Sequence, residues 1–307
     1  MNNVITKLQE ILTSSGWTQE QLAYNLEVSF STLNAWINNK AAPRAKAIST
    51  IDDAYLTIVG RTEIDTALLA SIKKRALDKH ITIKKIITNT ELLDKVTLYL
   101  TYHTNTIEGS TMTLSDVKEV LEDDNKVLAN KTAKEQTEAR NHRAALYYLI
   151  DELNAQGRNF RWTKDIILQT HLRLMNTLIS SVGAYRDHDV RIQGSPAALV
   201  SHVKIPEFMD ELITDLNKPT NDVIMDIAKT HSQFESIHPF SDGNGRTGRL
   251  IMFIQALQNG LVPPLVIKER KRAYYRYLEV AQMDSNYSLL VMFIAESMLF
   301  ANNLMKS

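Results

Sequence analysis

Apolar residues recur at helical spacing along most of the chain after residue 90. Residues 91–110, 134–156 and 221–238, for example, place apolar side chains at positions i, i+3 and i+4, which is the pattern of a helix with one buried face. The 307 residues include only 10 glycines and 7 prolines, and this scarcity favours long helices over many turns. We therefore expect an all-α fold for this part of the chain.

Residues 183–203 break the helical pattern. Val190 and Ile192 alternate with polar residues, and Gly194, Ser195 and Pro196 follow them directly. Alternation followed by a turn signal is typical of a short β-hairpin. We expect a small β-hairpin flap on an otherwise helical body.

The first 60 residues have the pattern of a separate small domain of four short helices. Thr18 is a candidate N-cap, and Leu22, Ala23 and Leu26 then repeat at helical spacing. A tight turn leads into a second helix over about residues 29–38. Two short helices joined in this way predict a helix-turn-helix.

Residues 61–90 form the expected connector between this domain and the rest of the chain. Their first part has a helical pattern. Residues 80–90, HITIKKIITNT, alternate and are rich in Ile and Thr, which allows an extended segment.

Composition narrows the classes of function. Lys plus Arg and Asp plus Glu both total 35, so the chain has no global positive field for nucleic acid or anionic membranes. The absence of cysteine excludes disulfides and thiolate chemistry. Apolar runs are far shorter than the roughly 20 residues of a membrane helix, and the N-terminus lacks a signal-peptide pattern. We expect a cytoplasmic protein without a membrane partner.

The segment HPFSDGNGRTGR at residues 238–249 concentrates candidate chemistry between two helical segments. Pro239 prevents the first helix from continuing, and a second helix should begin near Gly245. Its free N–H groups and dipole make an anion site. Arg246 and Arg249, three residues apart on its first turns, could grip successive phosphates.

Two further residues of this loop suit phosphate chemistry. Asp242 offers the carboxylate that Mg²⁺ takes together with phosphate oxygens. His238 has a side chain suited to act as a general base. The alternative is a structural turn, since glycine-rich turns and helix-start arginines are common. The combination of base, metal ligand and anion site in twelve residues favours a nucleotide-phosphate site.

The same segment resembles the motif HxFx(D/E)GNGRxxR of the Fic family at every defining position. The resemblance extends over roughly residues 90–300 and includes GAYRDHDVRIQG, which is similar to the family's flap. It implies a Fic-type helical bundle with a small β-hairpin flap over residues 91–307. An inhibitory helix would cover about residues 91–109, and the core about residues 135–260.

The resemblance also implies an activity, the transfer of AMP from ATP to a Ser, Thr or Tyr hydroxyl of a protein. His238 would deprotonate the hydroxyl and Asp242 would hold Mg²⁺. The implied ATP-binding residues are Gly243, Asn244, Gly245, Arg246, Arg249 and, near the adenine, Tyr274. Arg186, Val190 and Ile192 of the flap would dock the target as an added strand.

The segment TYHTNTIEGS contains a second match. Thr104 and Glu108 are four residues apart, and Gly109 follows as a candidate C-cap. Taken alone, this is a capped helix end with one exposed Glu. The resemblance implies instead an inhibitory (S/T)xxxE(G/N) helix, in which Glu108 pairs with Arg249 and blocks the γ-phosphate. The same Glu could orient water for removal of AMP.

The first 60 residues resemble the Cro/repressor type of helix-turn-helix. Candidate DNA-binding residues are Ser29, Ser31, Thr32, Asn34, Lys40 and Arg44. This segment has four basic and five acidic residues, which is unfavourable for phosphate binding. DNA binding and a protein-docking or dimerisation role therefore both stay open.

Three functions remain after this reasoning. The first is an autoinhibited protein adenylyltransferase, whose target is another protein or this chain itself. The second is a DNA-binding regulator whose Fic domain senses nucleotide. The third is a Fic enzyme that uses another donor or removes AMP. A homodimer is compatible with each.

Overall fold

The regular secondary structure of the described residues is almost entirely helical. The structure, a computed structural model, describes residues 2–192 and 198–306. Within these ranges it contains fifteen α-helices, three short 3-10 helices and one isolated β-bridge between His80 and Leu261. The all-α prediction is confirmed. None of the described helices is both long and apolar enough to cross a membrane.

The chain divides into two compact units, and the smaller one comprises residues 1–64 and 269–276. Its first four helices are α1 (Asn2–Ser15), α2 (Gln19–Asn25), α3 (Phe30–Ile37) and α4 (Ala45–Ile58). Thr18 and Gln21 cap α2 reciprocally, and the Ser29 hydroxyl accepts from the Thr32 N–H at the start of α3. Leu22, Leu33 and other apolar residues of these helices form the unit's own core.

A segment distant in sequence completes this smaller unit. The 3-10 helix η3 (Lys268–Arg270) leads into α14 (Lys271–Asp284), and residues 269–276 belong to the unit. The Arg272 guanidinium donates from Nη1 to the carbonyls of Thr13 and Ser14 at 2.9 and 3.1 Å. Cationic donors at a helix C-terminus satisfy its unpaired carbonyls.

The larger unit comprises residues 65–268 and 277–307. Its remaining helices are α5 (Thr66–Leu77), α6 (Ile83–Ile87), α7 (Thr90–Ile107), α8 (Leu114–Glu122), α9 (Ala133–Gln156), η1 (Gly157–Asn159), α10 (Lys164–Leu174), η2 (His202–Lys204), α11 (Ile205–Leu216), α12 (Val223–Ile237), α13 (Asn244–Gln258) and α15 (Ser288–Leu304).

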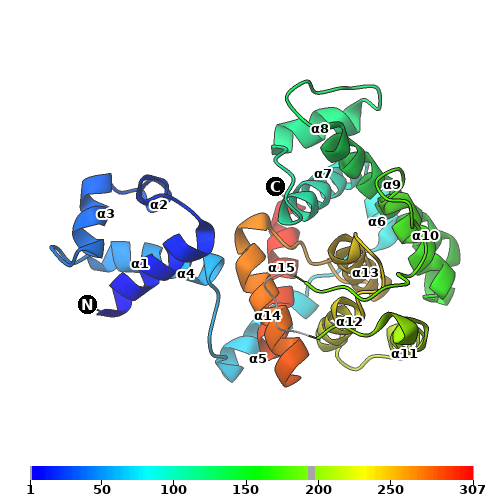
Figure 1. The fold of residues 1–307 in the computed structure, drawn as a ribbon. Helices are drawn as coiled ribbons and strands as arrows, with labels where there is room; N and C mark the ends of the chain where they lie inside the picture. The colour runs from blue at the N-terminus through cyan, green and yellow to red at the C-terminus, as the bar shows by residue number, and fades with distance from the viewer. Residues whose placement is uncertain (1, 193–197, 307) are drawn as a thin grey trace. The chain divides into compact units, whose positions relative to one another are not determined.

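Helix α13 occupies the centre of the larger unit. It packs against α7, α9, α10 and α12, and Figure 1 shows it among these helices. Nearly all of its residues are buried, including Arg246 and Arg249. A helix buried on every side is normally apolar, so these buried cations require partners within the fold.

The expected connector contains two helices that belong to the larger unit. Helix α5 packs on α15. An extended segment over residues 80–90 is wrong for residues 83–87, which form α6. The Thr82 hydroxyl caps this short helix by accepting from the Lys85 N–H, and Ile86 is fully buried. A cap and a buried anchor outweigh the weak β-propensity of Ile and Thr.

The predicted β-hairpin flap is corrected by the structure. No strand occurs in the described parts of the segment, residues 183–192 and 198–203, while residues 193–197 lie outside the described residues. Side chains take the backbone groups that strand pairing would need. The Arg186 guanidinium donates to the carbonyls of His188 and Val200, and Asp189 accepts from the His202 N–H.

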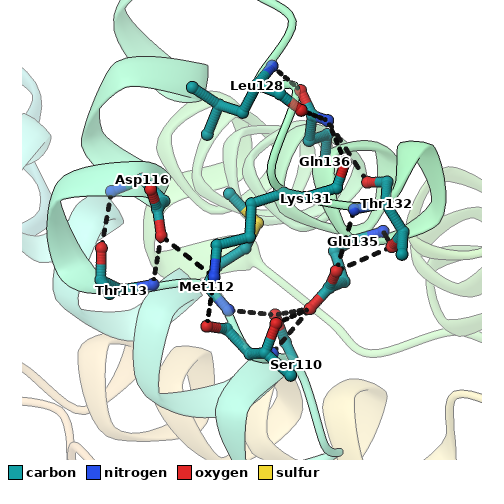
Figure 2. A network of polar contacts seen from close by, with 10 residues as sticks. Ser110, Met112, Thr113, Asp116, Leu128, Lys131, Thr132, Glu135 and Gln136 are labelled. Atoms are coloured by element: carbon teal, nitrogen blue, oxygen red, sulfur yellow. Dashed lines mark hydrogen bonds and ion pairs between the residues drawn. The ribbon is translucent and has the colours of Figure 1, made fainter.

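A network of polar contacts joins the segment after α7 to the start of α9 (Figure 2). The Glu135 carboxylate accepts from the backbone and hydroxyl of Thr111 at 2.6 and 2.8 Å, and from the backbone and hydroxyl of Thr132 at 3.1 and 2.8 Å. Lys131 donates to the Thr111 carbonyl at 2.7 Å. These contacts fix residues 110–111, directly after Glu108 and Gly109.

The Glu135 network should make stability depend on pH. Burial by itself would raise the pKa of Glu135, but the hydrogen bonds from Thr111 and Thr132 lower it to about 2. A depressed pKa stabilises the fold above the unfolded value near 4.5, and this contribution is lost as the pH falls toward 2. We expect Glu135→Gln to lower the free energy of unfolding at pH 7 by about 1–2 kcal/mol.

Urea unfolding followed by circular dichroism at several pH values would measure this effect. The difference between Glu135→Gln and the wild type should decrease once the pH falls below 4.5. Glu122→Gln is the control, because the Glu122 side chain is 64% exposed and lies 3.6 Å from Lys118 of the same helix. A difference that is independent of pH would contradict the assigned role.

Candidate active site

His238 lies between α12 and α13 with an unusual backbone conformation. Its φ and ψ are 48° and 58°, in the left-handed region, and its N–H donates to the Phe234 carbonyl at the end of α12. The residue before a proline normally prefers extended angles. A left-handed residue other than glycine is uncommon and often marks a functional position. Its side chain is 20% exposed, so the ring remains accessible.

Arg186 holds this conformation in place. Its Nε donates to the His238 carbonyl at 2.8 Å, and its Nη2 donates to the carbonyls of Val200 and Ile237 at 2.5 and 3.3 Å. The Arg186 N–H also donates to the Pro239 carbonyl at 2.9 Å. Arg186 is only 3% exposed, and in this structure its side chain bonds backbone carbonyls. Its part in docking a target stays a prediction.

Side chains within the loop fix its shape. The Asn244 amide bonds both backbone groups of Phe240, accepting from its N–H at 2.9 Å and donating to its carbonyl at 2.8 Å. Gly243 has φ 81°, and a Cβ there would lie 2.7 Å from the Met175 sulfur. This position therefore requires glycine for both backbone and space. The Asn244 side chain therefore orders the loop in this structure. Its predicted role in binding ATP stays a prediction.

His171 on α10 supports the loop from below. Its ring stacks on Phe240 with centroids 3.7 Å apart. Its Nδ1 accepts from the Gly183 N–H at 3.0 Å, so its Nε2 carries the proton and donates to the Asp242 carbonyl at 3.0 Å. Burial lowers the pKa of His171 to about 4, which keeps the ring neutral. Sequence spacing alone gave no signal for this role.

Arg246 and Asp242 lie together at the loop's far side. The Arg246 Nη1 donates to Glu138 on α9 at 3.0 Å, and its Nη2 donates to Asp242 Oδ1 at 3.4 Å. Arg246 is 4% exposed, whereas the Asp242 side chain is 50% exposed. The partner Glu138 was not predicted, because only the tertiary fold brings α9 to this position. The exposed Asp242 carboxylate could bind a metal ion, and the Arg246 guanidinium beside it could bind a phosphate.

Arg249 is engaged by the end of α7. Its Nε donates to the Thr104 hydroxyl at 2.6 Å, and its Nη2 donates to Glu108 Oε1 at 2.5 Å and to the Thr104 carbonyl at 3.3 Å. Glu108 is the C-cap of α7, and Gly109 follows with φ 107°. Arg249 is 2% exposed and Glu108 31%. The structure thus brings Thr104, Glu108 and Arg249 together.

Glu108 also covers the start of α13. A Cβ on Gly245 would lie 2.5 Å from Glu108 Oε1 and 3.0 Å from Arg249 Nη1. The carboxylate therefore lies against the first turn of α13, where free N–H groups and the helix dipole favour an anion. Since no side chain projects from Gly245, an anion can approach the backbone closely. One negatively charged group already occupies the site that the sequence predicts for phosphates.

The donor set around the loop suits Mg²⁺ bound together with a polyphosphate. The described residues contain no cluster of three or more His, Cys, Asp or Glu side chains that could hold a metal alone. Mg²⁺ commonly uses one or two carboxylates together with phosphate oxygens and water. Asp242 provides such a carboxylate next to Arg246, whose buried Nε has no hydrogen-bond partner among the described residues.

Three further residues were predicted on the flap and on the adenine side. Val190 and Ile192 are partly buried in the flap segment, with exposed Arg191 between them. Tyr274 is 1% exposed and contacts Tyr275, with ring centroids 5.2 Å apart. It belongs to the smaller compact unit. Its role beside an adenine stays a prediction.

The predicted DNA-binding residues lie at α3 and in the turn after it. Ser29, Ser31, Lys40 and Arg44 are exposed, and the hydroxyls of Ser31 and Thr32 bond that of Ser29 at 2.9 and 2.7 Å. The Asn34 amide donates to the Gln19 side chain at 3.3 Å, which joins α3 to α2.

Replacement of Arg186 by lysine should disturb the His238 backbone. Lysine has a single terminal ammonium and cannot reach four carbonyls in fork geometry. We expect Arg186→Lys to lower the free energy of unfolding by about 2–3 kcal/mol, because buried carbonyls lose their donors. Chemical denaturation would measure it, with exposed Arg191→Lys as the matched control. Equal stability of the two variants would contradict this role.

Comparison with known proteins places two segments of the chain in known families. Residues 161–256 match the Fic/DOC family, and residues 8–55 match a helix-turn-helix family. Protein adenylyltransferase fic-1 of Caenorhabditis elegans is 30% identical over 185 residues, which are 59% of this chain and 36% of that protein. Protein adenylyltransferase Fic of Aedes aegypti is 31% identical over 199 residues, 64% of this chain and 39% of that protein. The chain thus spans about two fifths of the length of these relatives.

Solved structures share the fold at lower identity. Fic-1 (residues 134–508) of C. elegans aligns with a TM-score of 0.67 and 21% identity, covering 94% of this chain and 84% of that one. A Fic family protein from Desulfovibrio desulfuricans aligns with a TM-score of 0.63 and 24% identity, covering 78% of this chain and 74% of that one. These matches identify a Fic/DOC family domain that includes residues 161–256 and an N-terminal helix-turn-helix over residues 8–55.

Proposed function

We propose that the chain is a Mg²⁺-dependent protein adenylyltransferase that moves AMP from ATP to a protein hydroxyl and is held inactive by Glu108. The observation that carries this proposal is the Glu108 carboxylate on Arg249 at the first turn of α13. An anion site of this kind suits a phosphate, and here it is filled by a carboxylate from the same chain. Relatives named protein adenylyltransferase support the donor and the reaction.

His238 is the proposed general base. Burial lowers the pKa of its imidazole to about 4, so the ring is neutral at pH 7 and can accept a proton. The target hydroxyl oxygen forms a bond to the α-phosphorus of ATP, and its proton passes to Nε2 of His238. The bond from the α-phosphorus to the bridging oxygen breaks, and pyrophosphate leaves. Positioning and neutralisation of charge supply most of the rate in such transfers.

The phosphate side of the site follows from the loop. We assign the β- and γ-phosphates to Arg246 and Arg249, and the α- and β-phosphates to the backbone of residues 243–245. Asp242 would hold Mg²⁺, which neutralises phosphate charge when bound. The flap segment with Val190 and Ile192 is the proposed docking site of the target. It would act by main-chain hydrogen bonds and therefore select position more than sequence.

The brake is a competition for one guanidinium. In the structure Arg249 has Glu108 and Thr104 as partners, and a γ-phosphate would need the same donors. The Glu135 network fixes the residues that follow Glu108, so the carboxylate is held over Arg249 by the fold rather than by its own flexible side chain. We propose that ATP adopts its productive pose only after Glu108 has moved.

Glu108→Gly should increase transfer of label from [α-³²P]ATP to a protein acceptor. We expect an increase of roughly 10- to 100-fold, since a hydrogen bond between charged groups contributes about 1.5–3 kcal/mol. Glycine is tolerated here because Glu108 is a C-cap residue. Combining this change with His238→Ala should remove the activity.

Two controls make this experiment specific. Glu119→Gln removes a carboxylate from the neighbouring helix α8, where Glu119 pairs with Lys126 at 3.0 Å, and should leave the rate unchanged. The chain itself and a cell lysate would both be offered as acceptors. A folded Glu108→Gly protein that binds ATP but transfers no label would refute adenylyl transfer and favour another donor, AMP removal or nucleotide sensing.

A second proposed function is DNA binding by the helix-turn-helix. The specific observation is that Ser31, Lys40 and Arg44 are exposed at and just after α3, the helix that would enter a major groove. The low charge of this unit predicts weak non-specific binding. A homodimer would match a symmetric site.

Selection from random duplex DNA, followed by fluorescence anisotropy, would test this function. We expect Lys40→Ala with Arg44→Ala to weaken binding and to reduce the slope of log K against log salt by about 2. The matched control is Lys134→Ala with Lys229→Ala, two exposed lysines of the larger unit. If no sequence is enriched, the docking or dimerisation alternative is favoured.

A further inference from the structure

Glu235 is a buried carboxyl group one helical turn before His238. It is 7% exposed, and its Oε2 lies 4.0 Å from His238 Nδ1. Its other oxygen, Oε1, has no hydrogen-bond partner among the described residues. A carboxyl group that is buried and incompletely paired destabilises a fold. Its place beside the proposed base therefore calls for an explanation other than stability.

The neighbouring helix leaves room for this carboxyl group. Gly248 on α13 faces it, and a Cβ at Gly248 would lie 2.6 Å from Glu235 Oε1 and 3.0 Å from the Phe234 ring. Glycine within a helix costs about 1 kcal/mol relative to alanine. Glu235 on α12 and Gly248 on α13 therefore both lower stability, and they lie next to each other. The space next to His238 fits a carboxyl group and excludes a larger residue at 248.

Charged groups from four segments of the chain act on this pair. Burial raises the pKa of Glu235 to about 7, while Arg249 on α13 lowers it and Glu108 at the end of α7 raises it. The pKa of His238 falls to about 4 through burial. The backbone of Glu235 raises it, Arg186 lowers it further, and Glu108 and Asp242 raise it. His231, which precedes Glu235 by one helical turn, has a pKa lowered to about 3 by burial and stays neutral.

These values describe a coupled pair that takes up protons in two steps. Burial raises the pKa of Glu235 and lowers that of His238, so the carboxyl group takes up the first proton and the imidazole the second. Above the first step, Glu235 is a carboxylate and the His238 ring is neutral. The Nδ1–H of His238 can then face the carboxylate, which leaves the Nε2 lone pair free for the target.

We propose, on the basis of the proposed adenylyl transfer, that Glu235 is a positioning residue for the base: its carboxylate orients His238 through Nδ1 and stabilises the imidazolium formed during transfer. The target hydroxyl proton goes to Nε2, and Nδ1 keeps its own proton throughout. Glu235 touches neither ATP nor the target. Gly248 contributes by leaving the space in which the carboxylate lies.

The activity test uses the full chain with Glu108→Gly as parent. Adding Glu235→Gln should lower kcat about tenfold, which is part of the typical contribution of general base catalysis, while KM for ATP stays unchanged. The parent should lose activity as the pH falls below 7, at a lower pH than the wild-type pKa of Glu235 because Glu108, which raises that pKa, is absent. Glu235→Gln should lose this dependence. Glu235→Asp keeps the charge and should restore part of kcat and the pH dependence.

A variant that only destabilises the fold should give a different result from Glu235→Gln. Thr230→Val is the matched control, because Thr230 is a buried polar residue of the same helix that bonds the Gln255 side chain at 2.9 Å. It should lower the melting temperature without moving the pH profile. If Glu235→Gln behaves like this control, or raises KM with kcat and the pH profile unchanged, the positioning role is refuted.

Gly248 provides a second, independent variant. Gly248→Ala places a methyl group against Oε1 and should lower kcat in the parent. In a protein that also carries Glu235→Ala, the methyl group has space, so the additional loss should be much smaller. Equal losses in both backgrounds would contradict the pairing of Gly248 with Glu235.

A titration without catalysis separates this inference from the proposed function. The His238 ring proton, assigned with His238→Ala, would be followed by NMR in the nucleotide-free full chain. In the wild type its signal should move near pH 7 and again near pH 4, and Glu235→Gln should abolish the upper step. An upper step that persists would refute the inference even if the enzyme is active. A parent without transferase activity would refute the proposed function alone.

Discussion

A buried arginine needs hydrogen-bond acceptors that offset its desolvation, and this constraint at Arg249 organises the centre of the larger unit. The side chain is 2% exposed and lies on a helix that packs on every side. Desolvation of a guanidinium costs several kcal/mol unless hydrogen bonds and a counter-charge offset it. Here Thr104 and Glu108 supply both. The end of α7 is therefore bound to α13 by a charge that could also be satisfied by a phosphate.

Other contacts hold the loop independently of the pair formed by Glu108 and Arg249. Arg186 fixes the His238 backbone, the Asn244 amide closes the loop onto Phe240, and His171 supports it through stacking and two hydrogen bonds. None of these contacts involves Glu108. The loop can hence keep its shape whichever anion pairs with Arg249. Under the proposed function, a fixed loop with a replaceable counter-ion would allow control by competition without refolding.

The pair of Arg249 and Glu108 also affects a buried carboxyl group. Glu108 and Glu235 both act on Arg249, one from the exposed side and one from the buried side. Removing one carboxylate changes the field at the other, and Glu235 lies 4.0 Å from the His238 ring. His238, the proposed base, and the proposed phosphate site are thus electrostatically coupled through Glu235 and Arg249.

Local sequence signals determined where several helices begin or end and which residues form the loop. Pro239 marks the end of α12, and Gly243 and Thr18 mark the starts of α13 and α2. Each acts on the backbone within a few residues of its own position. The twelve-residue loop motif and the Thr104–Glu108 spacing are equally local. Such features depend on covalent neighbours and are therefore visible in the chain.

Only the tertiary structure decided which distant groups meet. Glu138 reaches Arg246 across 108 positions, and Gly248 opens space for Glu235 on another helix. Arg186, predicted to dock a target, is buried, and its guanidinium donates to backbone carbonyls of the loop and of the flap segment. The same carbonyls are then not available for strand pairing in the described part of the flap. Burial and pairing of charge are properties of packing, and no spacing along the chain encodes them.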